Sequence, residues 1–204
     1  LAHPIYFRKV TREGKFFGYA VSGTTADCVK IAVGVIMKKR PDLIISGINH
    51  GANIGNNVLY SGTVGAAIGG RNLKYPPIAL SVASYDCKDK GYIAKKSAEI
   101  IHFIIDSSKG YEGKVFNVNL PDICENDYKG IKITTLATNG IPNKPLAVKS
   151  SDVITKYRYN LSGEPIQEDH LTDAKAVEEG YVSISILDYD LVNNNLSESF
   201  KKFL

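Results

Sequence analysis

The sequence lacks the features that mark several large classes of protein. No apolar run approaches the ~20 residues that a membrane-spanning helix needs, so we expect no membrane association. A dense basic run is also missing: the net charge is only +4, and Lys38-Lys39-Arg40 falls where a helix is expected to end. Cations there suit the helix dipole, so we do not expect binding to a nucleic-acid polymer. No internal repeat or low-complexity tract is present.

Cysteine is scarce and unpatterned. The three cysteines are Cys28, on the apolar face of an expected helix, and Cys87 and Cys124, in polar loops. An odd number without regular spacing does not predict a disulfide framework. We expect three free thiols in a reducing compartment, and therefore a cytoplasmic protein.

Two common kinds of catalytic motif are also missing. The sequence has no G-x-x-x-x-G-K-[ST] loop, which disfavours a kinase or NTPase of that type. It presents no Ser/His/Asp or Cys/His arrangement, which argues against covalent catalysis. His50 is more simply a loop residue than a catalytic base.

The 204 residues have the composition of one globular α/β domain, with 44% hydrophobic and 23% charged residues. Short apolar strands alternate with amphipathic helices, which predicts a doubly wound, Rossmann-like, mostly parallel sheet. We expect the core to comprise residues 1–138 and 173–190, followed by a C-terminal helix at 191–204. The expected strands are 5–10, 16–22, 43–46, 78–82, 115–120, 130–135 and 181–187, and the expected helices include 63–73 and one spanning 93–105.

Residues 139–172 interrupt this alternation. The segment is long and polar, and within it Tyr157 and Tyr159 alternate with Lys156 and Arg158. We interpret it as a protruding β-hairpin arm with one apolar face, used for oligomerisation. The alternative is a surface loop without fixed structure.

The most informative stretch is Ser46-Gly47-Ile48-Asn49-His50-Gly51-Ala52-Asn53-Ile54-Gly55, which runs on to Tyr60-Ser61-Gly62-Thr63-Val64. Its glycines and asparagines recur at four-residue spacing between an expected strand and an expected helix. Glycine permits a sharp bend and a close approach to a ligand. A helix beginning at Ser-Gly-Thr offers free N–H groups to an anion. A single glycine of this kind would indicate only a turn.

Taken as a whole, this stretch resembles the signature of the SurE family, the stationary-phase survival proteins, which reads close to S-G-I-N-x-G-x-N-x-G and then Y-S-G-T-V-x-A-A. The resemblance extends upstream, from Tyr19 to Lys30, and downstream, from Glu179 to Ser185. It implies a metal-dependent phosphomonoesterase that hydrolyses nucleoside 5′-monophosphates, with 3′-nucleotides and short polyphosphate as further substrates. It also implies a homodimer or tetramer joined through C-terminal elements.

The resemblance assigns roles to five residues. It implies that Asn49 is a ligand of Mg²⁺ or Mn²⁺, for which oxygen ligands are suitable. The other ligands of the family, an Asp-Asp pair and a serine, are not among these residues, and we expect an N-terminal segment of the complete protein to supply them. Asn53, Ser61, Gly62 and Thr63 are implied to bind the substrate phosphate, with Asn49 and Asn53 the catalytic pair. Asp27 is interpreted as a structural residue near the site.

Simpler interpretations of these residues remain open. Asn53 could belong to an Asx-turn, and Ser61 and Thr63 could cap a helix. A nucleotide- or phosphate-binding module without catalysis would carry the same residues.

Overall fold

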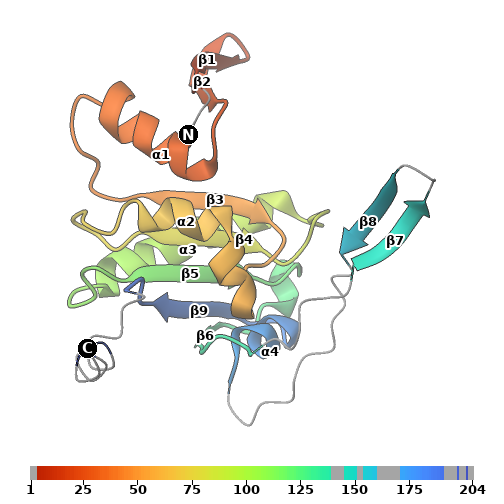
Figure 1. Cartoon of the computed structure of the whole chain (residues 1–204). Helices are drawn as coiled ribbons and strands as arrows, with labels where there is room; N and C mark the ends of the chain where they lie inside the picture. The colour runs from red at the N-terminus through yellow and green to blue at the C-terminus, as the bar shows by residue number, and fades with distance from the viewer. Residues whose placement is uncertain are drawn as a thin grey trace.

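A five-stranded sheet forms the centre of the computed structural model, which describes residues 4–138, 145–150, 154–159, 171–190, 197 and 201. The strand order is β3-β4-β5-β9-β6 (Figure 1). Three of its four strand pairings are parallel, and only the pairing of β5 with β9 is antiparallel. The predicted mostly parallel α/β fold is therefore confirmed. The strands are β3 (Ile45–His50), β4 (Ile78–Val82), β5 (Val115–Leu120), β6 (Ile131–Ile133) and β9 (Val182–Leu187).

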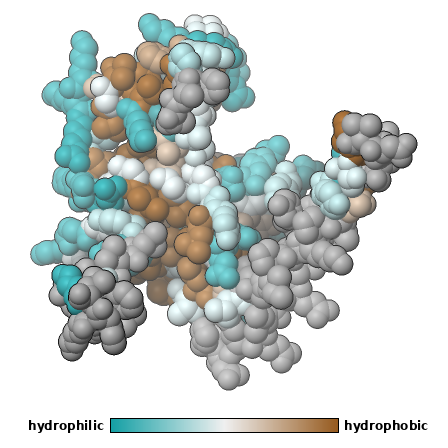
Figure 2. All heavy atoms as spheres, viewed as in Figure 1, coloured by the Kyte–Doolittle hydropathy of each residue, from teal (hydrophilic) through white to brown (hydrophobic). Residues whose placement is uncertain are grey.

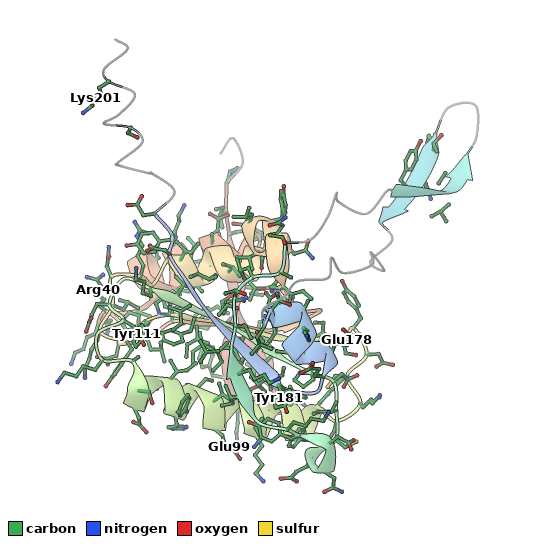
Figure 3. The ribbon with its side chains drawn as sticks, turned by 90° about the horizontal axis from the view of Figure 1, so that it is seen from below. Arg40, Glu99, Tyr111, Glu178, Tyr181 and Lys201 are labelled. Carbon is green, nitrogen blue, oxygen red and sulfur yellow. The ribbon has the colours of Figure 1, made fainter. Side chains whose placement is uncertain are left out.

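Helices lie on both sides of this sheet. The long helix α3 (Lys90–Ser107) covers one face, while α2 (Gly62–Ile68) lies on the other (Figure 3). The short helix α4 (Asp173–Glu178) packs against β9 and β5. Helix α1 (Thr25–Ile31) continues as a π-helical segment, Ala32–Ile36, and packs on α2. Figure 2 shows hydrophobic side chains gathered over α1 and α2 on the face in view.

Two antiparallel hairpins accompany the sheet. The first joins β1 (Phe7–Arg12) to β2 (Lys15–Val21), as the sequence predicts, and its turn has positive φ angles at Glu13 (51°) and Gly14 (73°). The second joins β7 (Pro145–Ser150) to β8 (Thr155–Tyr159), within the predicted arm. Whether that hairpin serves oligomerisation stays a prediction, as do the boundaries of the core. The C-terminal helix expected at 191–204 lies outside the described residues except at positions 197 and 201.

Several predicted boundaries are wrong, each for a local reason. The strand expected at 43–46 begins at Ile45 and continues to His50, because Asn49 and His50 pair with β4 after an irregularity in the register. Asn49 therefore lies within the strand and not beyond it. The helix expected at 63–73 ends at Ile68, where two glycines and a series of turns follow. Strand β6, expected at 130–135, is shorter and spans Ile131–Ile133. Helix α4 was not predicted.

The two faces of β5 differ in chemistry. Phe116, Val118 and Leu120 belong to the apolar core that includes the buried side of α3. The intervening residues Asn117 and Asn119 point to the opposite face, and both are fully buried. The face of β5 opposite to α3 therefore carries buried amide groups, which can form hydrogen bonds with the segment that covers this face.

No helix in the described ranges combines the length and the apolar character needed to cross a lipid bilayer. The three cysteines carry free thiols, as expected. Cys87 lies in the polar loop between β4 and α3, as predicted, but its side chain is buried against the core.

Candidate functional site

The glycine-rich segment begins within β3 and continues beyond it at the carboxyl ends of three parallel strands, where α/β proteins bind ligands. Its glycines are required by the backbone. Gly47 has φ +133°, and a Cβ there would collide with the carbonyl oxygen of Leu80. Gly51 has φ +99°, and a Cβ there would meet the ring of Tyr85 at 3.1 Å. The close approach that the sequence suggested is thus present, but it is to the protein's own β4 and the loop after it.

Asn53 is held by three side chains of the sheet. Its N–H donates to Oδ1 of Asn119 (2.8 Å), and its carbonyl accepts from Nδ2 of both Asn117 (2.8 Å) and Asn119 (3.1 Å). Its own side-chain Nδ2 donates to Oγ of Ser81 (2.8 Å). With only 8% of its surface exposed, Asn53 fastens the loop to the polar face of the sheet. Its contact with a substrate phosphate stays a prediction.

The anchoring asparagines were missed in the sequence, although a signal was present. The strand V-F-N-V-N-L alternates asparagine with apolar residues, and the strand V-S-I-S-I-L does the same with serine. Alternation places the polar residues of each strand on one face. Ser183 and Ser185 both contact Thr134 through their hydroxyls, at 2.8 and 2.9 Å. Among the described residues, Oδ1 of Asn117 has no hydrogen-bond partner.

Asn49, the expected metal ligand, is half-buried near the end of β3. Its Nδ2 donates to the carbonyl of Gly51 (2.8 Å), which fixes the side-chain amide against the loop. No hydrogen bond to its Oδ1 is found in the described part of the chain. The neighbouring His50 is exposed, and its Nδ1 lies 3.2 Å from the carbonyl of Tyr85. The prediction that His50 is a loop residue is wrong, because it is the last residue of β3 and pairs with Val82 of β4.

The Ser61-Gly62-Thr63 turn begins α2. Oγ of Ser61 accepts from the N–H of Val64 (3.1 Å), so Ser61 is the N-cap of this helix. Oγ1 of Thr25 donates to the carbonyl of Gly62 (2.6 Å), which ties the turn to the start of α1. Thr63 is 8% exposed. The capping role thus belongs to Ser61, while Thr63 lies inside the first turn of α2. Phosphate binding by these residues stays a prediction.

Asp27 has the structural role that the sequence suggested. It forms a capping box with Thr24: its carboxylate accepts from the N–H and the hydroxyl of Thr24 (2.9 and 2.8 Å). These hydrogen bonds hold the pKa of Asp27 below its usual value. Asp27 therefore fixes the beginning of α1, the helix whose Thr25 holds the Ser61–Thr63 turn.

A second carboxylate, Asp173, was not recognised in the sequence. It is fully buried in the first turn of α4 and accepts hydrogen bonds from backbone N–H groups, one of which belongs to Gly55. The signal for a helix start was the pair Thr172-Asp173, since threonine is a favoured N-cap. The contact with Gly55, however, spans a separation of 118 residues that no local pattern contains.

Known proteins resemble this chain in sequence and in structure. The family described as "Survival protein SurE" matches residues 1–143. The 5′-nucleotidase SurE of Natranaerobius thermophilus is 40% identical over 188 residues, which are 91% of this chain and 72% of that protein. The 5′-nucleotidase SurE of Pelotomaculum thermopropionicum is also 40% identical, over 94% of this chain and 73% of that protein.

A solved structure extends the likeness to the fold. The crystal structure of the SurE protein from Aquifex aeolicus superposes with a TM-score of 0.77 at 33% identity, covering 100% of this chain and 81% of that one. Sequence motif, fold and relatives agree: this chain belongs to the SurE family.

Proposed function

We propose that this protein is a 5′-nucleotidase that hydrolyses nucleoside 5′-monophosphates to a nucleoside and phosphate. The observation that carries the proposal is the complete glycine-rich motif at the carboxyl ends of β3 and β4, in a chain 40% identical to proteins named 5′-nucleotidase SurE. We place the reaction at this edge of the sheet.

The dependence on a divalent metal rests on the family, with Mg²⁺ or Mn²⁺ as the proposed ion. The amide oxygen of Asn49 fits such an ion chemically. It is, however, a single ligand, and no group of three His, Cys, Asp or Glu side chains in the described ranges could hold a metal. These residues alone do not complete a metal site, and we assign no reaction step to the ion. When bound, such a cation would supply positive charge and activate a water molecule.

The phosphate is the part of the substrate that the chain itself is expected to hold. Because Oγ of Ser61 accepts the Val64 N–H, its own hydroxyl hydrogen remains able to donate to a phosphate oxygen. We propose that the N–H of Gly62 and the side chains of Thr63 and Asn53 complete the donors. The Thr25 hydrogen bond to Gly62 keeps the turn in place without a charged residue.

An alternative is a binding module that holds a nucleotide without hydrolysing it. The glycine-rich motif does not distinguish the two functions, because a module that only binds phosphate would carry the same residues. Release of phosphate from AMP by the complete protein, with and without Mn²⁺, separates the two functions. We expect release that depends on Mn²⁺ and stops when the ion is chelated. Saturable AMP binding without phosphate release in the presence of either ion would reject the enzyme in favour of the module.

We further propose that the protein is a homodimer or tetramer and that the β7–β8 hairpin takes part in self-association. Val148, Ile154 and Tyr157 of the hairpin region are each more than 60% exposed (62, 62 and 64%), which suits a surface that another subunit covers. Light scattering coupled to size exclusion, with wild type and a Val148→Lys variant, tests this assembly. A cytoplasmic location is part of the same proposal and rests on the free cysteines.

A further inference from the structure

Asp173 joins three segments that lie far apart in the sequence. Its Oδ2 accepts the N–H of Gly55 (2.9 Å), and its Oδ1 accepts the N–H groups of Ala137 (2.9 Å) and Ala174 (2.8 Å). Its own N–H donates to the carbonyl of Thr135 (2.9 Å). The glycine loop, the segment after β6 and the start of α4 therefore meet at one carboxylate.

This carboxylate is expensive to bury. Asp173 is 0% exposed, and no lysine or arginine in the described ranges forms an ion pair with it. Burial raises the pKa of Asp173, while the N–H donors around it act in the opposite direction. A cap for α4 alone would not require this arrangement, because Thr172 already provides the N-cap by accepting the N–H of Lys175.

The hydrogen bond from the Gly55 N–H connects Asp173 to the segment that leads to the Ser61–Thr63 turn. Gly55 is buried, has φ +54°, and begins the 3₁₀ helix Gly55–Tyr60 that leads directly to Ser61. Two residues earlier, Asn53 is fastened to the sheet by Asn117 and Asn119. The loop is thus held at two nearby points, and Asp173 is the ionisable one.

We propose that Asp173 is a positioning residue of the phosphate site, which it serves by fixing Gly55 and thereby the path from Asn53 to the Ser61–Thr63 turn. This inference rests on the proposed function, since it assumes that the turn holds phosphate. Asp173 itself makes no contact with the substrate.

Two variants separate positioning from simple support of α4. Asp173→Asn keeps the size of the side chain but replaces one of its two acceptor oxygens by an NH₂ group. Where this NH₂ group faces Gly55, it cannot accept the Gly55 N–H. Thr172→Ala removes the N-cap bond of the same helix and leaves Asp173 in place. Both variants are made in the complete protein. The measurements are the affinity for inorganic phosphate by calorimetry, kcat and KM for AMP, and amide hydrogen exchange along the chain.

We expect Asp173→Asn to weaken phosphate binding and raise the KM for AMP by about tenfold, with kcat changed much less, because uniform binding of the phosphate is lost. Exchange should accelerate at residues 53–61. Thr172→Ala should accelerate exchange within α4 and leave phosphate affinity and KM within about twofold of wild type. Equal losses in both variants, or wild-type phosphate affinity in Asp173→Asn, would overturn the positioning role.

If Asp173→Asn does not fold, amide hydrogen exchange in the wild-type protein tests the positioning role instead. The Gly55 amide should exchange far more slowly than that of Gly14 in the exposed β1–β2 turn, and more slowly still with saturating phosphate. Exchange as fast as at Gly14, or unaffected by phosphate, would contradict the proposal. A wild type that neither binds phosphate nor hydrolyses AMP would reject the proposed function, whereas a wild type that does both while Asp173→Asn matches it would reject the positioning role alone.

Discussion

Asn119 holds the main chain of Asn53 from both sides: its Oδ1 accepts the N–H at 2.8 Å, and its Nδ2 donates to the carbonyl at 3.1 Å. One buried side-chain amide thus does for the glycine loop what a neighbouring strand does within a sheet. The separation of 66 residues makes this a contact between distant parts of the chain. This contact attaches the glycine loop to the sheet at Asn53.

Replacing Asn119 by alanine should therefore destabilise the protein. Two hydrogen bonds are lost and the Asn53 N–H is left in a buried position, at a cost of about 1–3 kcal/mol. Unfolding by urea measures the change in free energy. Asn57→Ala, on the exposed side of the following 3₁₀ helix, is the matched control and should change the free energy by less than about 0.5 kcal/mol. Equal effects of the two substitutions would contradict the anchoring role of Asn119.

Asn49→Ala should remove most of the activity of the complete protein. If the amide oxygen of Asn49 binds the metal, its loss should lower kcat/KM for AMP by at least about 100-fold and weaken Mn²⁺ binding measured by calorimetry. His50→Ala is a suitable control, because His50 is the exposed neighbour and its ring lies against the Tyr85 carbonyl. Activity close to wild type with unchanged Mn²⁺ affinity would rule out the assignment.

Two glycines should respond to alanine in opposite directions. At Gly47 the new Cβ would collide with the Leu80 carbonyl and the φ angle of +133° would be strained, so Gly47→Ala should cost at least about 3 kcal/mol. At Gly65, in α2, an added Cβ would have no described atom within 4 Å apart from its chain neighbours and the nearby backbone of the helix itself. Gly65→Ala should therefore stabilise the protein by about 0.5–1 kcal/mol. Thermal unfolding of both variants checks the signs. A stabilising Gly47→Ala would mean that β3 does not pass beside β4 as described.

The stability contributed by Asp27 should depend on pH in the acid range. Its folded pKa lies below the unfolded value, chiefly because of the Thr24 hydroxyl hydrogen bond, so the contribution is present above about pH 4 and is lost as the pH falls further. The difference in urea midpoint between wild type and Asp27→Asn should be constant from about pH 7 to 5 and shrink at lower pH. Asp106→Asn, on the exposed end of α3, corrects for the change in net charge. A difference that grows on acidification would contradict the capping geometry.

Much of the architecture was predictable from local patterns. The strands at Ile78–Val82 and Val115–Leu120 were predicted at their observed bounds. The first is a largely apolar run after Pro76-Pro77, and the second is a short, mostly apolar segment that ends at Pro121. Helix α4 was not, since six residues offer too little periodicity to recognise. The extension of β3 to His50 depends on pairing with β4 and could not be read from a glycine-rich sequence.

The candidate site, too, was predictable from the sequence only in part. The motif located the loop and its glycines, while the residues that hold the loop, Asn119 and Asp173, come from segments 66 and 118 residues away. Such partners depend on how the sheet is assembled, and one sequence gives no information about that. The metal-binding and phosphate-binding roles of Asn49, Asn53, Ser61, Gly62 and Thr63 stay predictions.

The opposite chemistry of the two faces of β5 also limits the ways in which this chain can misfold. A slip of one residue between β5 and its neighbours would turn Asn117 and Asn119 toward α3 and bring Val118 beneath the loop. Both amides would then be stranded in hydrocarbon, and Asn53 would lose its attachment in the same event. The register of the central strand therefore decides whether the loop above it can be attached.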